Sequence, residues 1–238
     1  VIQGLQGGQG GSGGYSGSGG NGGPVFGIDV VDSSGLSVSK LQVSGILGAP
    51  GGTGGYDENG GNGGATFGAR FTGCKGLSLE EMKVNDIGGG VGGSYAYSGD
   101  VGGKGGEATG ILVDSCTSSA ADRVTVRKVS GGAGAPDKYA MPTQSGAATG
   151  SEFVDSAGFT WQHSIVADVS SGLGSSLSAR GLAGMRVDNC PLMKIRNSVV
   201  HGIGFDTNWG LIAGVVTTAS QNAPLSLLDS IVGEVTGT

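Results

Sequence analysis

Three aspartates are the residues in this sequence whose type and spacing could support catalysis: Asp114, Asp155 and Asp188. They stand near the same place in three successive blocks of similar sequence, with Glu152 and Arg186 close by. Grouped carboxylates can act as the acid and base of glycoside cleavage, and they can also bind Ca²⁺. The sequence therefore contains the residue types of a carbohydrate-active site.

Ion pairing between blocks explains the same charges better. Glu152 can pair with Arg186, and Asp29 can pair with Arg70, across neighbouring strands. The chain has only 2 histidines, which argues against a histidine-based metal site or catalytic triad. We therefore expect no catalytic residue, no metal and no cofactor, with incidental Ca²⁺ as the one ion that could bind.

The tyrosines point to a different kind of site. All 5 lie at the tips of glycine-rich segments and none lies in an apolar block. Tyrosine is rigid and amphipathic, and Asn, Ser and Gly around it supply adaptable hydrogen bonds. The residues of the expected binding surface are Tyr15, Tyr56, Asp57, Glu58, Asn59, Tyr95, Tyr97, Asp100 and Tyr139. The tyrosines could instead anchor each tip on its neighbour, and both interpretations stay open.

The cysteines follow a structural pattern. Cys74, Cys116 and Cys190 occupy the same offset in their blocks, where other blocks have serine. This predicts a row of small buried side chains. A disulfide between Cys74 and Cys116 is conceivable, whereas Cys190 lies too many blocks away to be bridged. The redox state of the cysteines is not readable from the sequence.

Internal repeats determine the fold that positions these residues. Six blocks of equal length align without a gap, each with glycine as its second residue, and they span residues 26–46, 67–87, 109–129, 149–169, 183–203 and 213–233. Within a block, apolar and polar residues alternate, which indicates short strands. A block of this size cannot bury an apolar face alone, but stacked blocks can.

The blocks resemble the repeats of the pectin-lyase-like β-helix superfamily. The resemblance implies an all-β fold, a right-handed parallel β-helix of about six coils, formed as a single solenoid domain over residues 1–238. The sixth block fits worst, because Thr217, Ser230 and Gly233 stand where other blocks have apolar residues. Val1 and Ile2 fit the end of a preceding coil, so we expect a segment of a longer chain.

Glycine-rich insertions separate the blocks, at residues 3–24, 47–65, 88–107, 130–147, 170–182 and 204–212. In the first three, glycines come in pairs with one residue between them. A period of three matches the polyproline-II type of helix. We therefore predict that the arms form a slab of antiparallel polyglycine-II helices beside the β-helix. This use of glycine resembles the tips of phage tail-fibre adhesins.

Composition limits the function. The 238 residues include 54 glycines, and the net charge of −6 argues against nucleic acid or an anionic membrane as partner. No apolar run is long enough to span a membrane. No Thr-x-Thr row supports ice binding.

We expect an extracellular or cell-surface solenoid that is not an enzyme. It would serve in adhesion or as a subunit or segment of a filament, self-associating through its coil ends and presenting its tips to a glycan or a cell-surface receptor. The alternative is a carbohydrate-binding or carbohydrate-active β-helix protein.

Overall fold

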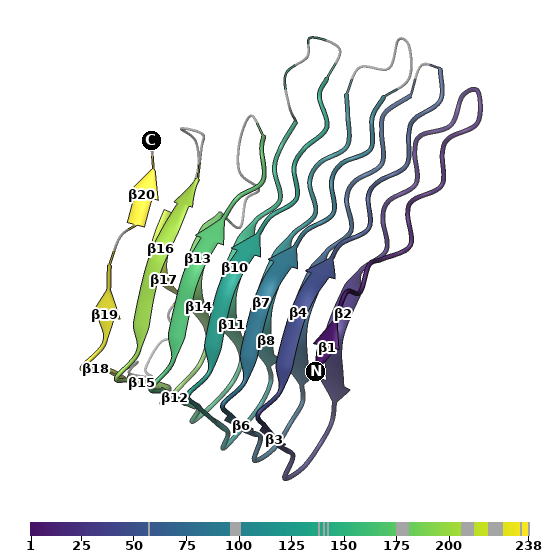
Figure 1. Cartoon of the computed structure of the whole chain (residues 1–238). Helices are drawn as coiled ribbons and strands as arrows, with labels where there is room; N and C mark the ends of the chain where they lie inside the picture. Colours follow the sequence, from purple (N-terminus) through teal and green to yellow (C-terminus); the bar gives the residue numbers. More distant parts are fainter. Residues whose placement is uncertain are drawn as a thin grey trace.

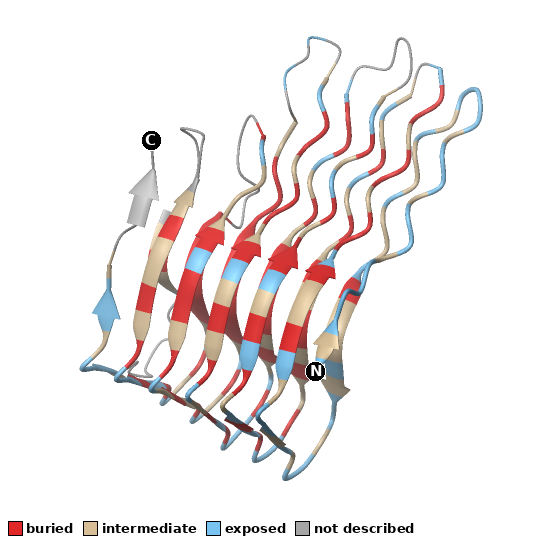
Figure 2. Ribbon diagram, in the orientation of Figure 1, coloured by how far each residue is buried: buried red, intermediate tan, exposed pale blue. Residues whose placement is uncertain are grey.

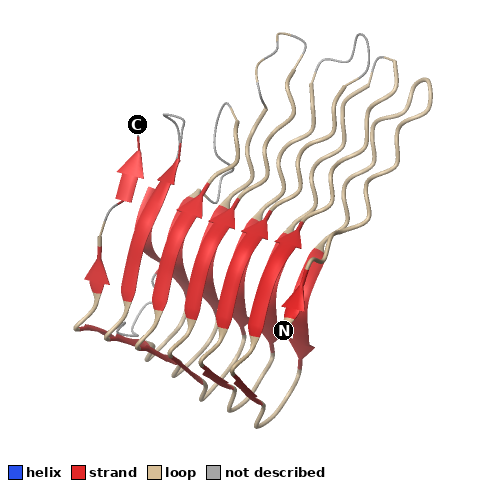
Figure 3. Cartoon of the chain, in the orientation of Figure 1, coloured by secondary structure: helices blue, strands red, loops and turns tan. Residues whose placement is uncertain are grey.

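The computed structural model describes the chain except for residues 57, 96–100, 138, 140, 142, 175–180, 206–211, 219–225, 234 and 238. Strands joined by turns and long loops make up the described part, which contains no helix (Figures 1 and 3). No helix long and apolar enough to cross a membrane therefore occurs in it. The strands form three sheets, and every pairing within them is parallel.

Each coil contributes one strand to each of sheets I, II and III, except that two short strands at the C-terminal end of sheet I both pair with the same neighbour. Sheet I contains β1 (Ile2–Gln3), β4 (Gln42–Leu47), β7 (Lys83–Gly88), β10 (Thr125–Ser130), β13 (Ile165–Ser170), β16 (Val199–Phe205), β19 (Ile231–Val232) and β20 (Val235–Gly237). Sheet II contains β2 (Val25–Val31), β5 (Thr66–Thr72), β8 (Ala108–Asp114), β11 (Ala148–Val154), β14 (Leu182–Asp188) and β17 (Ile212–Thr218). Sheet III contains β3 (Ser37–Ser39), β6 (Ser78–Glu80), β9 (Ala120–Asp122), β12 (Thr160–Gln162), β15 (Lys194–Arg196) and β18 (Ser226–Leu228).

The chain passes through sheets II, III and I in turn and then starts the next coil. This is a right-handed parallel β-helix, and the predicted fold class is confirmed. The register also follows the aligned blocks, since Val43, Val84 and Val126 pair in successive coils of sheet I. Trp161 pairs with Ile195 in sheet III and is fully buried.

The second half of the sixth block departs from the gapless alignment. Val200 pairs with Val232 rather than with Ser230, and Ile203 pairs with Val235 rather than with Gly233. Seven residues separate β17 from β18, whereas five separate β14 from β15. Val232 and Val235 therefore occupy the paired positions that the alignment had assigned to residues two places earlier in the chain.

The core runs along the axis between the three sheets (Figure 2). Phe153, Phe159 and Trp161 fill it in the fourth coil, with ring centroids 5.0 Å apart for the two phenylalanines and 5.4 Å apart for Phe153 and Trp161. Each coil buries its apolar face on its neighbours, as a stack of repeats requires.

The glycine-rich loops run side by side away from one end of the sheets (Figure 1). Backbone hydrogen bonds join the two arms of a loop, as from Gly61 N to Gly52 O at 2.9 Å. Others join neighbouring loops, as from Gly52 N to Gly20 O at 2.8 Å. Such bonds are expected of packed glycine helices, and the polyglycine-II slab and the number of coils remain predictions.

Candidate functional site

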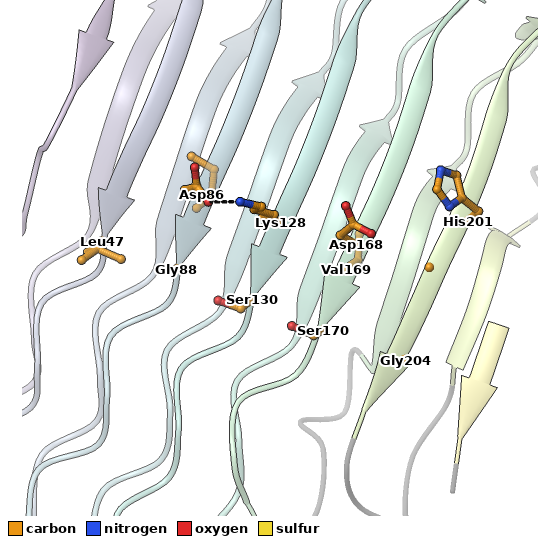
Figure 4. A pocket seen from close by; sticks show the side chains of 12 residues that line it. Leu47, Asp86, Gly88, Lys128, Ser130, Asp168, Val169, Ser170, His201 and Gly204 are labelled. Atoms are coloured by element: carbon orange, nitrogen blue, oxygen red, sulfur yellow. Dashed lines mark ion pairs between the residues drawn. The ribbon is translucent and has the colours of Figure 1, made fainter. Parts of the chain in front are cut away.

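A shallow groove of about 740 Å³ crosses the outer face of sheet I. It spans five neighbouring strands, β4, β7, β10, β13 and β16 (Figure 4). The side chains that give it chemical character are Asp86, Lys128, Asp168 and His201, one from each of the last four strands. Parallel stacking therefore places these four groups in sequence across the sheet.

A left-handed residue at the same place in β4, β7, β10, β13 and β16 presents the charged residues. Asp86, Lys128 and Asp168 have φ angles of 55°, 52° and 57°, in the left-handed region. Gly45 and Gly202 have the same conformation at the equivalent positions, and the strand pairing skips this residue each time. Both partner strands skip one residue at this place, so the register is kept and the left-handed residues stack from coil to coil.

The charges of the groove alternate. Asp86 Oδ1 lies 3.5 Å from Lys128 Nζ, and both side chains are more than half exposed. Asp168 follows on β13, and a Cβ atom at Gly202 would lie 3.0 Å from Asp168 Oδ1. Because glycine stands there, the carboxylate can lie close to the strand that carries His201. The groove thus offers a cation, two carboxylates and an imidazole to one bound molecule.

The floor beside these groups is made of small residues. Gly88, Ser130, Ser170 and Gly204 line it, and Leu47 closes one end. No bulky side chain interrupts this row, so a flat molecule can approach the backbone of several strands at once.

A second polar cluster lies at the turns after sheet III. His163 Nδ1 and Asp122 Oδ1 are 2.8 Å apart, and Asn197 Nδ2 lies 3.3 Å from His163 Nε2. The hydrogen bond with His163, aided by the charge of Arg123, holds the pKa of the Asp122 carboxyl below its usual range. Arg123 also pairs with Glu80. These groups satisfy one another, so the cluster is structural.

The three aspartates singled out from the sequence do not form a metal site. Asp155 accepts a hydrogen bond from Asn189 Nδ2 at 2.5 Å, and Asp114 accepts one from Ser115 Oγ at 2.8 Å. No group of three or more His, Cys, Asp or Glu residues in the described part of the chain could hold a metal ion. Asp155 therefore bonds to the next coil, whereas Asp114 bonds to its neighbour in the sequence.

The predicted ion pairs between coils are confirmed. Arg70 Nη2 lies 2.6 Å from Asp29 Oδ2, and its guanidinium lies 4.1 Å from the centre of the Phe26 ring. Arg186 Nε lies 4.0 Å from Glu152 Oε1, and both side chains are buried.

Some predicted tip residues come together. The Tyr15 and Tyr56 rings stack with centroids 5.4 Å apart, and Tyr56 N donates to Tyr15 O. Ser18 Oγ donates to Glu58 Oε2 at 2.8 Å. Tyr139 is exposed on a later loop. Asp57, Tyr97 and Asp100 lie outside the described residues. The stacked Tyr15 and Tyr56 rings agree with the interpretation that tyrosines anchor each tip on its neighbour. Binding of a ligand by the tips, including Tyr95, stays a prediction.

The cysteines are free and buried, and they lie in the predicted row. Cys74 N donates to Cys116 Sγ at 3.3 Å, Cys116 N to Ser156 Oγ at 3.1 Å, and Ser156 N to Cys190 Sγ at 3.4 Å. Burial raises the pKa of the Cys116 thiol to about 11. These thiols therefore link coils rather than react.

Sequence reasoning missed the groove of sheet I. The signal was present, because Gly45, Asp86, Lys128, Asp168 and Gly202 occupy one column of the aligned blocks. Glycine and charged residues share this column because it is both left-handed and outward.

No protein-family profile matches the chain, and no characterised protein matches its sequence. Among solved structures, the chain is similar to a periplasmic alginate epimerase, with 8% identity, a TM-score of 0.35 and coverage of 87% of this chain and 47% of the epimerase. It is also similar to an alginate lyase from Paenibacillus, with 12% identity, a TM-score of 0.30 and coverage of 87% of both chains. The chain spans about half the length of the epimerase. Such similarity concerns the fold alone.

These neighbours contradict the expectation of a non-enzymatic adhesive or filament-forming solenoid. They are enzymes named for their action on alginate, a polysaccharide. The finding favours the alternative, a carbohydrate-binding or carbohydrate-active β-helix protein, and the adhesive interpretation is withdrawn.

Proposed function

We propose that this chain is a carbohydrate-active β-helix protein that holds a segment of an acidic polysaccharide in the groove of sheet I. The groove carries the proposal, because it presents Asp86, Lys128, Asp168 and His201 on four successive strands. Neighbouring strands lie about 4.8 Å apart, which is close to the length of one sugar unit in an extended chain. An extended sugar chain that crosses the strands can therefore contact several of them at once.

The groups suit the parts of an acidic sugar. Lys128 is a compact charge for a sugar carboxylate. Asp86 can accept hydrogen bonds from hydroxyl groups, and the small floor residues allow a sugar ring to lie close to the backbone. Such a polymer would be met outside the cytoplasm, in keeping with the extracellular or cell-surface location expected from the sequence.

Proton transfer next to a carboxylate is the reaction that these groups support best. Lys128 would stabilise the negative charge that develops when the carbon beside the carboxylate loses its proton. His201, with Asp168 on the strand before it, can take that proton. Return of a proton from water to the opposite face gives the epimer, whereas departure of the neighbouring glycosidic oxygen, which takes up a proton from water as its bond to carbon breaks, gives an unsaturated chain end. The enzymes of similar fold act on alginate, a polymer of uronic acids, so polyuronates are the first substrates to test.

The test measures binding and turnover separately. Calorimetry with a polyuronate and with a neutral glucan tests the acidic class, while ultraviolet absorbance detects unsaturated chain ends and NMR in deuterated water detects epimerisation. We expect Lys128→Ala to weaken polyuronate binding by about tenfold or more, as for loss of a charged hydrogen bond. We expect His201→Ala to bind and to lose turnover.

Lys194→Ala serves as the matched control, because Lys194 is an exposed lysine of sheet III. It should leave binding unchanged. Equal binding of the neutral glucan, or equal losses in the two lysine variants, would overturn the proposal.

A further inference from the structure

We propose that the glycine-rich loops carry a second binding site, which takes an anionic sugar. A hollow of about 680 Å³ lies over three successive returning arms, which lead into β5, β8 and β11 of sheet II. This volume is within the usual range of ligand pockets. The site is separate from the groove of sheet I and does not depend on the function proposed for that groove.

Two asparagines on one side of the hollow are held in a defined orientation. Asn59 Oδ1 accepts a hydrogen bond from Val101 N at 3.1 Å, and Asn62 Oδ1 accepts one from Lys104 N at 3.0 Å. Only the amide oxygen can accept from a backbone N–H, so these contacts fix which end of each amide faces the next arm. The NH₂ groups of both residues are left to donate, and both residues are exposed and line the hollow.

The other charged groups make the hollow favourable for an anion. Lys104 lines it and adds an ammonium group to the two amide donors. Asp137 is the acidic residue in the lining, and its Oδ1 already accepts hydrogen bonds from Tyr139 N and Met141 N at 2.8 and 2.9 Å. Donors therefore outnumber the acceptors that remain for a ligand.

Apolar surface in the same hollow indicates a sugar rather than a bare anion. Val101 is 43% exposed and Met141 is 58% exposed, and both line the hollow beside the polar groups. A pyranose ring has C–H faces that pack on such side chains, and its carboxylate and hydroxyl oxygens can accept from the amides and the ammonium. We therefore assign the site to the uronic acid unit of an oligosaccharide.

The asparagines also tie neighbouring arms together, and the test must separate that role from binding. Asn21 Oδ1 accepts a hydrogen bond from Asn62 N at 2.9 Å, but Asn21 does not line the hollow. Asn62→Asp keeps an oxygen for Lys104 N and replaces the outward NH₂ with a charged oxygen. Asn21→Asp makes the same chemical change at a residue that links two arms but does not line the hollow.

The experiment titrates the full chain, in a Lys128→Ala background that weakens the groove, with a trisaccharide of hexuronic acid. Calorimetry gives the affinity, and the NMR signals of the Asn59 and Asn62 side-chain amides report where the ligand binds. We expect these signals to shift, and we expect Asn62→Asp and Lys104→Met each to weaken binding by about tenfold or more. Asn21→Asp should bind like the parent.

Maltotriose and sodium sulfate distinguish the ligand classes. Weak or absent binding of both supports an anionic sugar, whereas sulfate as tight as the uronate would show a simple anion site and overturn the sugar assignment. Unshifted amide signals, or an equal loss in Asn21→Asp and Asn62→Asp, would overturn the site itself.

Discussion

Single residues in this chain are constrained by backbone conformations that recur in each coil. In the turn before sheet III, Gly35, Gly76, Ser118, Gly158 and Leu192 all have a positive φ, between 52° and 67°. A side chain at such a φ costs about 1–2 kcal/mol, and only glycine adopts it without that strain. The same turn is therefore relaxed in some coils and strained in others.

Leu192→Gly should stabilise the protein. Leu192 has a φ of 61° and is 61% exposed, so the change relieves backbone strain and removes little packing. Since glycine gains more freedom on unfolding, the net increase in the free energy of unfolding should be about 0.5–1 kcal/mol. Gly158→Ala is the matched reverse change, because its Cβ atom would meet nothing within 4 Å. Urea denaturation should show opposite shifts of the midpoint, and shifts of the same sign would contradict the argument.

Asp122 should make the protein sensitive to acid. Its hydrogen bond with His163 lowers the pKa of its carboxyl in the folded state, so the unfolded chain takes up a proton first as the pH falls. The stability from this pair is fully present above the unfolded aspartate pKa of about 3.9 and is lost as the pH falls through the folded pKa. The difference in urea midpoint between wild type and Asp122→Asn should therefore be larger at pH 6 and should shrink progressively as the pH falls below about 3.9. A constant difference would show that the pair does not contribute in this way.

At the scale of elements, rows of like residues join the coils. Val124 N donates to Ser164 Oγ at 2.9 Å and Ser164 N to Ser198 Oγ at 3.3 Å, which parallels the row that contains the cysteines. In the loops, the residue that recurs is glycine, because the arms approach too closely for a side chain. Small polar residues thus recur at the turns because they form hydrogen bonds between coils. Glycine recurs in the arms because the arms lie too close together for a side chain.

Gly61→Ala should disrupt the packed arms, whereas Gly11→Ala should not. A Cβ atom at Gly61 would lie 2.0 Å from Gly20 O, while one at Gly11 would meet nothing within 4 Å. Such overpacking costs about 1–3 kcal/mol. Hydrogen exchange should show faster exchange of the Gly52, Gly61 and Gly93 amides in Gly61→Ala only. Fast exchange of these amides in the wild type would instead show that the arms are not packed.

The alignment of repeats predicted the elements well, because stacking requires equivalent residues to recur at fixed offsets. It placed the cysteines in one row. It failed after residue 218, where a longer connection shifts the register, so that Val232 and not Ser230 pairs with Val200. It also missed the groove, since Asp86, Lys128 and Asp168 gather there through a left-handed backbone conformation that alternation alone does not predict.

As a whole molecule, the chain is a stack whose coils differ in burial. Phe153 and Trp161 in the fourth coil are fully buried, whereas Leu227 in β18 is 46% exposed and Ile231 in β19 is 63% exposed. In a repeat protein, stability is approximately the sum of the terms within coils and between neighbouring coils. The coils that carry the groove and the hollow therefore lie in the best-packed part of the described chain.

Trp161→Ala should destabilise the stack far more than Leu227→Ala. Trp161 lies between Ala121 and Ile195 in sheet III and packs edge-on against Phe153, so its removal leaves a cavity that two neighbouring coils share. Loss of a fully buried aromatic side chain costs about 3–5 kcal/mol. Leu227 is half exposed and pairs on one side with Ile195, so its loss should cost about 1 kcal/mol or less.

Hydrogen exchange measured along the chain locates these two losses. Trp161→Ala should speed exchange in β10, β13 and β16, on both sides of the cavity, and Leu227→Ala should affect only β15 and the strands that follow it. Because each coil contacts only its neighbours, exchange should remain slow in β4 and β7 in both variants. Uniformly faster exchange in all strands after Leu227→Ala would show that the molecule unfolds as one cooperative unit and not coil by coil.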